Sequence, residues 1–161
     1  MTETRALPVG LVLLSLSSTA FSLDEIGWRA SGRGGGVAAG HAASVAAGIE
    51  ILENGGNAAD AEAATLLALS VTDYGAFAFG GEVPLLIYDA KAEEVKVLCG
   101  LGRAPLDQAA IDWYYEHGIP ADGSMKSAPV PGAPDMFVSV LRLYGTISFA
   151  EAAAPTLRLL D

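Results

Sequence analysis

The 161-residue sequence is short of positive charge and of cysteine. It contains 9 Lys and Arg residues against 19 Asp and Glu residues, so its formal net charge is −10. Nucleic-acid binding through phosphate contacts needs clustered Lys and Arg, and the sequence has no basic stripe. We therefore expect no nucleic-acid partner. The single cysteine, Cys99, excludes a disulfide within the chain and leaves the redox compartment undecided.

Common motifs of hydrolases and metal sites are also missing. There is no G-x-S-x-G, no H-E-x-x-H and no cysteine pair, so we expect no metal and no cofactor. Cys99 and two distant histidines, His41 and His117, leave a thiol nucleophile open, although a small apolar filler is the favoured interpretation of Cys99. His41 is interpreted as a polar helix cap, because no second metal-type ligand follows it at helical spacing.

No apolar run reaches the roughly 20 residues of a comfortable membrane span. At the N-terminus, Arg5 precedes an apolar run over residues 6–16, and the small residues Ala20 and Ser22 follow. This order is typical of a secretory signal peptide, here residues 1–22. It predicts a secreted or periplasmic protein. The alternative is an uncleaved anchor or a disordered start, and without a signal peptide the protein would be cytoplasmic.

Residues 41–71 have the strongest pattern and predict two helices joined by a tight corner. Apolar residues recur at helical spacing in the first helix, at Val45, Ile49 and Leu52. The glycines within 54–56 are suited to end it, because glycine adopts the left-handed conformation without steric cost. Asn57 is placed to cap the second helix, and Asp60 adds negative charge to its first turn. Residues 61–71 carry one charge, which indicates a buried helix.

A short strand is predicted at 36–39, leading into the first helix. Gly34, Gly36 and Ala39 also fit the loose dinucleotide pattern G-x-G-x-x-A. That pattern has meaning after a strand and before a helix in a βαβ unit, and no convincing strand precedes it here. Nucleotide binding is therefore the less favoured interpretation.

Residues 72–81 form a loop rich in glycine and aromatics, and a β-hairpin is predicted after it. Its strands are 84–89 and 95–98, with a turn at 90–93. The continuous apolar run at 85–87 predicts a strand that is buried on both faces.

Helices are predicted for most of the remaining chain. Residues 107–116 form one helix, closed by Gly118. A second helix has an apolar face, formed by Phe137, Val140, Leu141 and Tyr144. Ser148 and Glu151 make a capping box for a last helix, which Pro155 is expected to kink or restart because proline lacks an amide donor.

Four segments occur in the order in which they occur in the γ-glutamyltransferase (γ-glutamyltranspeptidase) family. They are GGNAADA (55–61), FGGEVPLLIYDAKAEEVKVLCG (79–100), VPG (130–132) and LRLYGTISFAEAAAPTLRLL (141–160). The sequence thus resembles the N-terminal part of that family's large subunit from about residue 36 onward. The resemblance implies an α+β segment of the αββα fold of N-terminal-nucleophile (Ntn) hydrolases. This segment should be mainly helical, with one β-hairpin, and residues 23–161 would be an incomplete domain.

The resemblance also implies the reaction. Family members use an N-terminal threonine, exposed by self-cleavage, to transfer or hydrolyse γ-glutamyl amides such as glutathione. The self-cleavage motif, two threonines followed by histidine, is absent from this sequence. The nucleophile is therefore expected beyond this chain, in a missing C-terminal small subunit, and residues 1–161 alone are expected to be inactive. The implied partners are a γ-glutamyl donor and an amino-acid, peptide or water acceptor.

The family resemblance implies a substrate-binding role for the segment GLGRAP (100–105). The family typically carries R-E-x-A-P here, and its arginine pairs with the α-carboxylate of the substrate. Aligning Ala104 and Pro105 puts Leu101 at the position of that arginine, and Arg103 follows two residues later. Arg103 is the candidate substrate-binding residue, because a guanidinium offers a planar two-pronged donor to a carboxylate. The alternatives are an ordinary surface arginine and an acylase-like or amidase-like substrate.

A second hypothesis of function remains open. The chain could be a stand-alone, non-catalytic helical module derived from the family, with its acidic charge and apolar faces serving a partner protein. We favour the enzyme segment, because four ordered motifs are more specific than composition.

Overall fold

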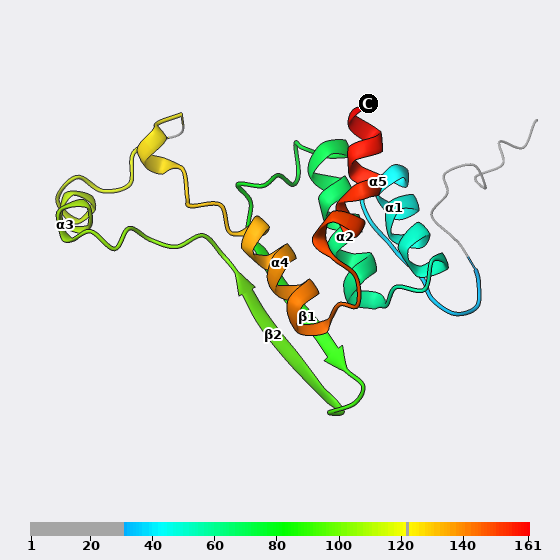
Figure 1. Ribbon diagram of the computed structural model, residues 1–161. Helices are drawn as coiled ribbons and strands as arrows, with labels where there is room; N and C mark the ends of the chain where they lie inside the picture. Colours follow the sequence, from blue (N-terminus) through cyan, green and yellow to red (C-terminus); the bar gives the residue numbers. More distant parts are fainter. Residues whose placement is uncertain (1–30, 122) are drawn as a thin grey trace, which may run out of the picture. The chain divides into compact units, whose positions relative to one another are not determined.

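The computed structural model describes residues 31–121 and 123–161 (Figure 1). All its elements belong to one compact unit, Arg33–Asp161. The elements are α1 (Ala42–Glu53), α2 (Ala58–Thr72), β1 (Val83–Asp89), β2 (Glu94–Gly100), α3 (Gln108–His117), α4 (Ala133–Tyr144) and α5 (Phe149–Leu160), with a 3-10 turn at Met125–Ser127. The described part is therefore mainly helical with one two-stranded antiparallel hairpin, as the sequence predicts. The predicted signal peptide, residues 1–22, lies outside the described residues and stays a prediction.

The corner between α1 and α2 is built as its sequence predicts. Gly55 adopts φ 90°, where a side chain would be strained. The side chain of Asn57 accepts hydrogen bonds from the amides of Ala59 and Asp60, and the Asp60 carboxylate accepts one from the Asn57 amide in return. This reciprocal capping box fixes the start of α2 at Ala58. His41 caps α1 in the predicted way, with Nδ1 accepting from the amide of Ala43.

Helix α2 is the central element of the unit, as its low charge predicts. It packs against α1, α4 and α5 (Figure 1). Its buried residues are Ala59, Asp60, Ala61, Ala63, Ala64, Thr65, Leu67 and Ala68. Because most of them are alanines, neighbouring backbones approach closely.

The buried face of α1 differs from the predicted one. The apolar residues Val45, Ile49 and Leu52 are only partly buried. The buried positions are instead Ser44, Ala47, Gly48 and Ile51. Small residues face α2 because the two helices cross at close range. The contact therefore requires side chains of small volume more than it requires hydrophobic ones.

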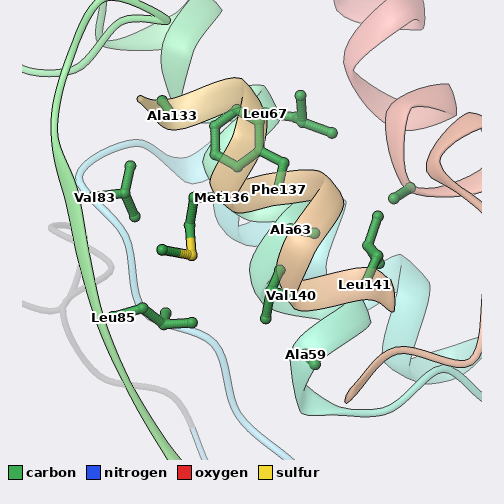
Figure 2. Packing of buried hydrophobic residues seen from close by; sticks show 11 residues of the cluster. Ala59, Ala63, Leu67, Val83, Leu85, Ala133, Met136, Phe137, Val140 and Leu141 are labelled. Atoms are coloured by element: carbon green, nitrogen blue, oxygen red, sulfur yellow. The ribbon is translucent and has the colours of Figure 1, made fainter. Parts of the chain in front are cut away.

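The main hydrophobic cluster lies between α2, α4 and the hairpin (Figure 2). Phe137 on α4 is fully buried at its centre. Two aromatic rings from the loop after α2, Phe77 and Phe79, contact Phe137 edge-on at centroid distances of 6.3 and 6.2 Å. Val83 and Leu85 bring β1 to the same cluster. The predicted apolar face of α4 is thus confirmed as the core-forming face.

The hairpin is covered on one face, which corrects the prediction of a strand buried on both faces. Burial alternates along β1: Leu85 is 4% exposed, whereas Leu86 is 72% exposed. Leu86 pairs with Val97 across the hairpin, and both side chains are exposed. The apolar run failed as a signal because α4 packs on one side of the hairpin and no described element packs on the other. We call the uncovered side the outer hairpin face; it comprises Pro84, Leu86, Tyr88, Val95, Val97 and Cys99.

The outer hairpin face should bind hydrophobic dyes in the 161-residue chain. Replacing Leu86 and Val97 together by Thr should lower the fluorescence of bound ANS and leave the melting temperature nearly unchanged, because both side chains are exposed. The matched control, Leu85→Thr, should cost roughly 2 kcal/mol or more, since it places a hydroxyl in the core. Equal ANS binding before and after the double substitution would show that the dye binds elsewhere.

Two further expectations about individual elements are wrong, the second in part. Residues 36–39 form no strand, because no described segment pairs with them. Pro155 does not restart the last helix, because α5 runs unbroken from Phe149 to Leu160; a kink at Pro155 stays a prediction. The predicted capping box of Ser148 and Glu151 is present at the start of α5. The helix tolerates Pro155 in its second turn, where this residue is buried.

The remaining helix, α3, begins and ends where the sequence predicts within one residue. Asp107 caps its start, and Gly118 closes it with φ 73°. None of its residues is buried. Its contacts are with the segment that follows: Lys126 lies 3.5 Å from the centre of the Trp113 ring, and Tyr114 donates to the carbonyl of Lys126.

Candidate functional site

The segment that carries Arg103 forms the loop between β2 and α3. It leaves the hairpin at Gly100 and continues to the N-cap of α3. The Arg103 side chain is exposed, and it forms no ion pair with any residue of the described ranges. Leu101, at the position expected to hold the family's arginine, is 44% exposed. Both side chains are thus accessible, and no residue of 31–121 or 123–161 forms an ion pair with the guanidinium.

The base of this loop is held by close backbone packing against residues 130–132. A β-carbon on Gly102 would collide with the carbonyl oxygen of Val130. A β-carbon on Gly132 would collide with the carbonyl oxygen of Gly100 and lie 2.8 Å from the amide nitrogen of Gly102. Two of the segments recognised in the sequence therefore lie side by side, although about 30 residues separate them.

The glycine-rich loop after α2 reaches the same end of α4. Phe77 and Phe79 hold that loop against Phe137, while Met136 lies against Gly100. The first turns of α4 thus position both loops. We call the loop over 101–106, with its glycine base, the arginine loop.

Gly132→Ala should release the arginine loop. The added methyl group has no room between Gly100 and Gly102, so we expect faster tryptic cleavage after Arg103 in the folded protein. The matched control is Gly80→Ala, because Gly80 lies in open space. Limited proteolysis followed by mass spectrometry measures both rates. If the two variants are cleaved equally fast, the glycine contacts do not hold the loop.

Other residues considered from the sequence do not assemble into a reactive centre in the described ranges. Cys99 is exposed on the outer hairpin face and not packed as an apolar filler, so that expectation is wrong. His41 caps α1, and His117 stacks on Trp113 at 4.6 Å. No group of three or more His, Cys, Asp or Glu side chains that could hold a metal ion occurs among residues 31–121 and 123–161.

Three of the four threonine hydroxyls in residues 31–121 and 123–161 are hydrogen-bonded within the fold. Thr65 donates to the carbonyl of Ala61, and Thr72 donates to that of Ala68. Thr146 donates to Asp60 at 2.6 Å. Thr156 is buried on α5, and its hydroxyl has no hydrogen-bond partner in the described ranges. Nor does any helix in the described part of the chain have the length and apolar content to cross a bilayer.

Comparison with known proteins decides the family. The family model described as gamma-glutamyltranspeptidase matches residues 44–161. The chain belongs to this family. A "glutathione hydrolase-like YwrD proenzyme" of Bacillus subtilis is 33% identical over 109 residues, which are 68% of this chain and 21% of that protein. The chain therefore spans about a fifth of the length of this relative.

Solved structures of the γ-glutamyltranspeptidase family have the same fold. The γ-glutamyltranspeptidase of Helicobacter pylori is 27% identical with a TM-score of 0.70, covering 83% of this chain and 39% of that one. A cephalosporin acylase of Bacillus halodurans is 29% identical with a TM-score of 0.63, covering 71% of this chain and 22% of that one. The described unit is thus an α+β, mainly helical portion of an Ntn-hydrolase fold.

Sequence reasoning singled out Arg103 but missed what holds its loop. The family resemblance marks the VPG segment, yet nothing local shows that Gly132 packs on Gly100. The available signal was the glycine pair at 100 and 102 and the single glycine at 132, because glycine often marks a close backbone approach.

Proposed function

We propose that this chain is the N-terminal segment of an enzyme that transfers or hydrolyses γ-glutamyl amides such as glutathione. The nucleophile would be an N-terminal threonine outside this chain, on a C-terminal small subunit. The acceptor would be an amino acid, a peptide or water. The observation that carries the proposal is the arginine loop: an accessible guanidinium on a braced loop, in a chain of this family.

In this proposal Arg103 binds the carboxylate of the γ-glutamyl donor. A planar guanidinium can donate two parallel hydrogen bonds to a carboxylate, which fixes the donor's orientation as well as its position. Arg103 is the only Lys or Arg between Lys96 and Lys126, in a chain with formal net charge −10. The close packing of Gly102 and Gly132 limits the freedom of the loop, which lowers the entropic cost of holding the substrate.

A second donor class is favoured by one observation. Leu101 presents a partly exposed apolar side chain at the place where the family resemblance expects the carboxylate-binding arginine. An acyl donor whose carboxylate lies elsewhere, or is absent, would suit this surface, and one structural neighbour is a cephalosporin acylase. Substitution of Arg103 distinguishes the two donor classes.

In the complete gene product, Arg103→Ala should lower kcat/KM for γ-glutamyl-p-nitroanilide by roughly 10- to 100-fold, mainly through KM, because hydrogen bonds to a charged group are lost. Arg103→Lys should restore only part of the loss, since an ammonium lacks the fork. The control is Arg142→Ala on the exposed side of α4. If Arg103→Ala behaves like the control while activity persists, the donor is bound without Arg103 and the second class gains support.

A further inference from the structure

The β-hairpin ends in two loops that carry opposite charges. The last pair of its ladder is Val83 and Gly100. From this pair the chain leads back into the glycine-rich loop after α2 and onward into the arginine loop, so both loops lie at one end of the hairpin (Figure 1). The first residues beyond the pair are Glu82 and Leu101. Glu82 therefore lies at the same hairpin end as the position where the family resemblance expects a carboxylate-binding arginine.

Glu82 and Leu101 lie on the uncovered side of this hairpin end. Val83 is buried, and a β-carbon on Gly100 would lie 2.9 Å from Met136, so the last pair of the ladder faces α4. Side chains alternate between the two sides of a strand, so the next positions outward belong to the other side. The exposure of both side chains agrees with this placement. An acidic and an apolar side chain thus share the open side of the hairpin end.

The carboxylate of Glu82 is accessible to a ligand. It forms no ion pair with any residue of 31–121 or 123–161. Residues 74–82 and 101–106 contain one acidic residue, Glu82, and one Lys or Arg, which is Arg103. Asp107, which follows the arginine loop, is engaged as the N-cap of α3. At this place Coulomb forces favour a ligand that brings a cationic group to Glu82, and they oppose one that brings only a carboxylate.

We propose that Glu82 binds an ammonium group on the acyl part of the donor, and that the enzyme selects its donors by this ammonium. The substrate class is then 4-aminoacyl amides, in which the ammonium lies on the fourth carbon of the acyl chain. γ-Glutamyl amides are the members that also carry a carboxylate on that carbon. The inference rests on the proposed function, because it assigns a further binding residue to the same donor site.

The chemistry of the three side chains fits such a donor. The Glu82 carboxylate accepts hydrogen bonds from the ammonium, which has three N–H donors. Arg103 binds the carboxylate where the donor has one, and Leu101 contacts the methylene groups of the acyl chain. A donor that lacks the ammonium leaves Glu82 without its partner, and a carboxylate on that donor adds like-charge repulsion. A donor with the ammonium alone should therefore be better than one with the carboxylate alone.

Four p-nitroanilides separate the two charged groups of the donor. The γ-glutamyl anilide carries both groups, the 4-aminobutyryl anilide only the ammonium, the glutaryl anilide only the carboxylate, and the butyryl anilide neither. We measure kcat/KM from the release of p-nitroaniline by the complete gene product. The 4-aminobutyryl anilide should exceed the glutaryl anilide by roughly 10-fold or more. A preference for the glutaryl anilide overturns the proposal.

Substitution of Glu82 tests the residue. Glu82→Gln should lower kcat/KM roughly 10-fold or more for the two donors that carry an ammonium and leave the other two within about 2-fold. Glu82→Asp, which keeps the charge, should retain part of the selectivity. The control is Glu93→Gln in the turn at the opposite end of the hairpin, which removes the same charge and should change none of the four values.

The outcomes separate this inference from the proposed function. A proportional loss for all four donors in Glu82→Gln, or no loss, overturns the ammonium role, whereas turnover of γ-glutamyl anilide by the wild-type protein still supports the proposed function. If Arg103→Ala changes no value while Glu82→Gln acts as expected, the carboxylate role of Arg103 fails and the ammonium role of Glu82 stands. If the self-cleaved wild-type protein hydrolyses none of the four, the proposed function fails and the inference falls with it.

Discussion

Asp60→Asn should cost roughly 3 kcal/mol or more of the free energy of unfolding. Asp60 is fully buried at the start of α2, yet it joins two segments that are 86 residues apart. One carboxylate oxygen accepts hydrogen bonds from the amide of Asn57 and the hydroxyl of Thr146, and the other accepts from the amides of Thr146 and Ile147. An asparagine amide group is a donor on one side, so either orientation opposes an N–H group to a backbone N–H group.

The same network predicts how stability depends on pH. Burial alone would raise the pKa of Asp60, but hydrogen bonds from Thr146, Asn57 and Ile147 outweigh it and hold the pKa below its ordinary value of 3.8. A carboxyl whose pKa is lowered in the folded state stabilises that state above the unfolded pKa. This contribution should be present above about pH 4 and should be lost as the pH falls through the lowered folded pKa.

Urea unfolding measures both effects, with Asp135→Asn as the control. Asp135 is exposed in the first turn of α4 and makes no hydrogen bond through its side chain in the described ranges, so its loss should cost a few tenths of a kcal/mol. The wild-type protein should lose stability below pH 4 more steeply than Asp60→Asn does. Parallel curves for the two proteins would show that Asp60 does not carry the acid dependence.

Gly48→Val should lower the free energy of unfolding by about 1 to 3 kcal/mol, although it replaces a weak helix former. Gly48 lies where α1 crosses α2. A β-carbon there would collide with the hydroxyl of Thr65 and would lie 3.1 Å from both the carbonyl of Ala61 and the side chain of Val37. The helices would have to separate, which would also move Val37.

Ala46→Val is the matched control for Gly48→Val, because Ala46 is exposed on the same helix. Its cost should be limited to the lower helix propensity of valine, a few tenths of a kcal/mol. Thermal or urea unfolding of both variants gives the comparison. Equal losses of stability would mean that the crossing is looser than the glycine contact indicates.

Local signals in the sequence were sufficient for most of the secondary structure. The capping boxes at Asn57 and Ser148 and the glycine stops at Gly55 and Gly118 act within a few residues, so they can be read directly. The hairpin was predicted for the same reason. These features depend on backbone geometry and short-range hydrogen bonds, which neighbouring residues determine.

Features that depend on distant partners were missed or predicted wrongly. The hydrogen bond between Asp60 and Thr146 joins the first turn of α2 to the loop between α4 and α5, and the sequence does not show that these segments meet. Leu86 was assigned to a buried strand because hydrophobicity does not reveal how many layers cover a sheet. Residues 36–39 were predicted as a strand, but a strand requires a partner, and none lies in the described ranges. Arg103 was found through the family resemblance. The packing of Gly132 against the base of the arginine loop could be seen only in the folded structure.

The central claim is that these residues form part of a γ-glutamyl-processing enzyme whose nucleophile lies elsewhere. The most direct measurement is the release of p-nitroaniline from γ-glutamyl-p-nitroanilide by two proteins: residues 1–161 alone and the complete gene product. We expect no turnover above a matched blank for the first protein and clear turnover for the second. Turnover by residues 1–161 alone would contradict the external nucleophile. A complete product that is inactive after self-cleavage, toward this donor and toward glutathione, would contradict the proposed reaction.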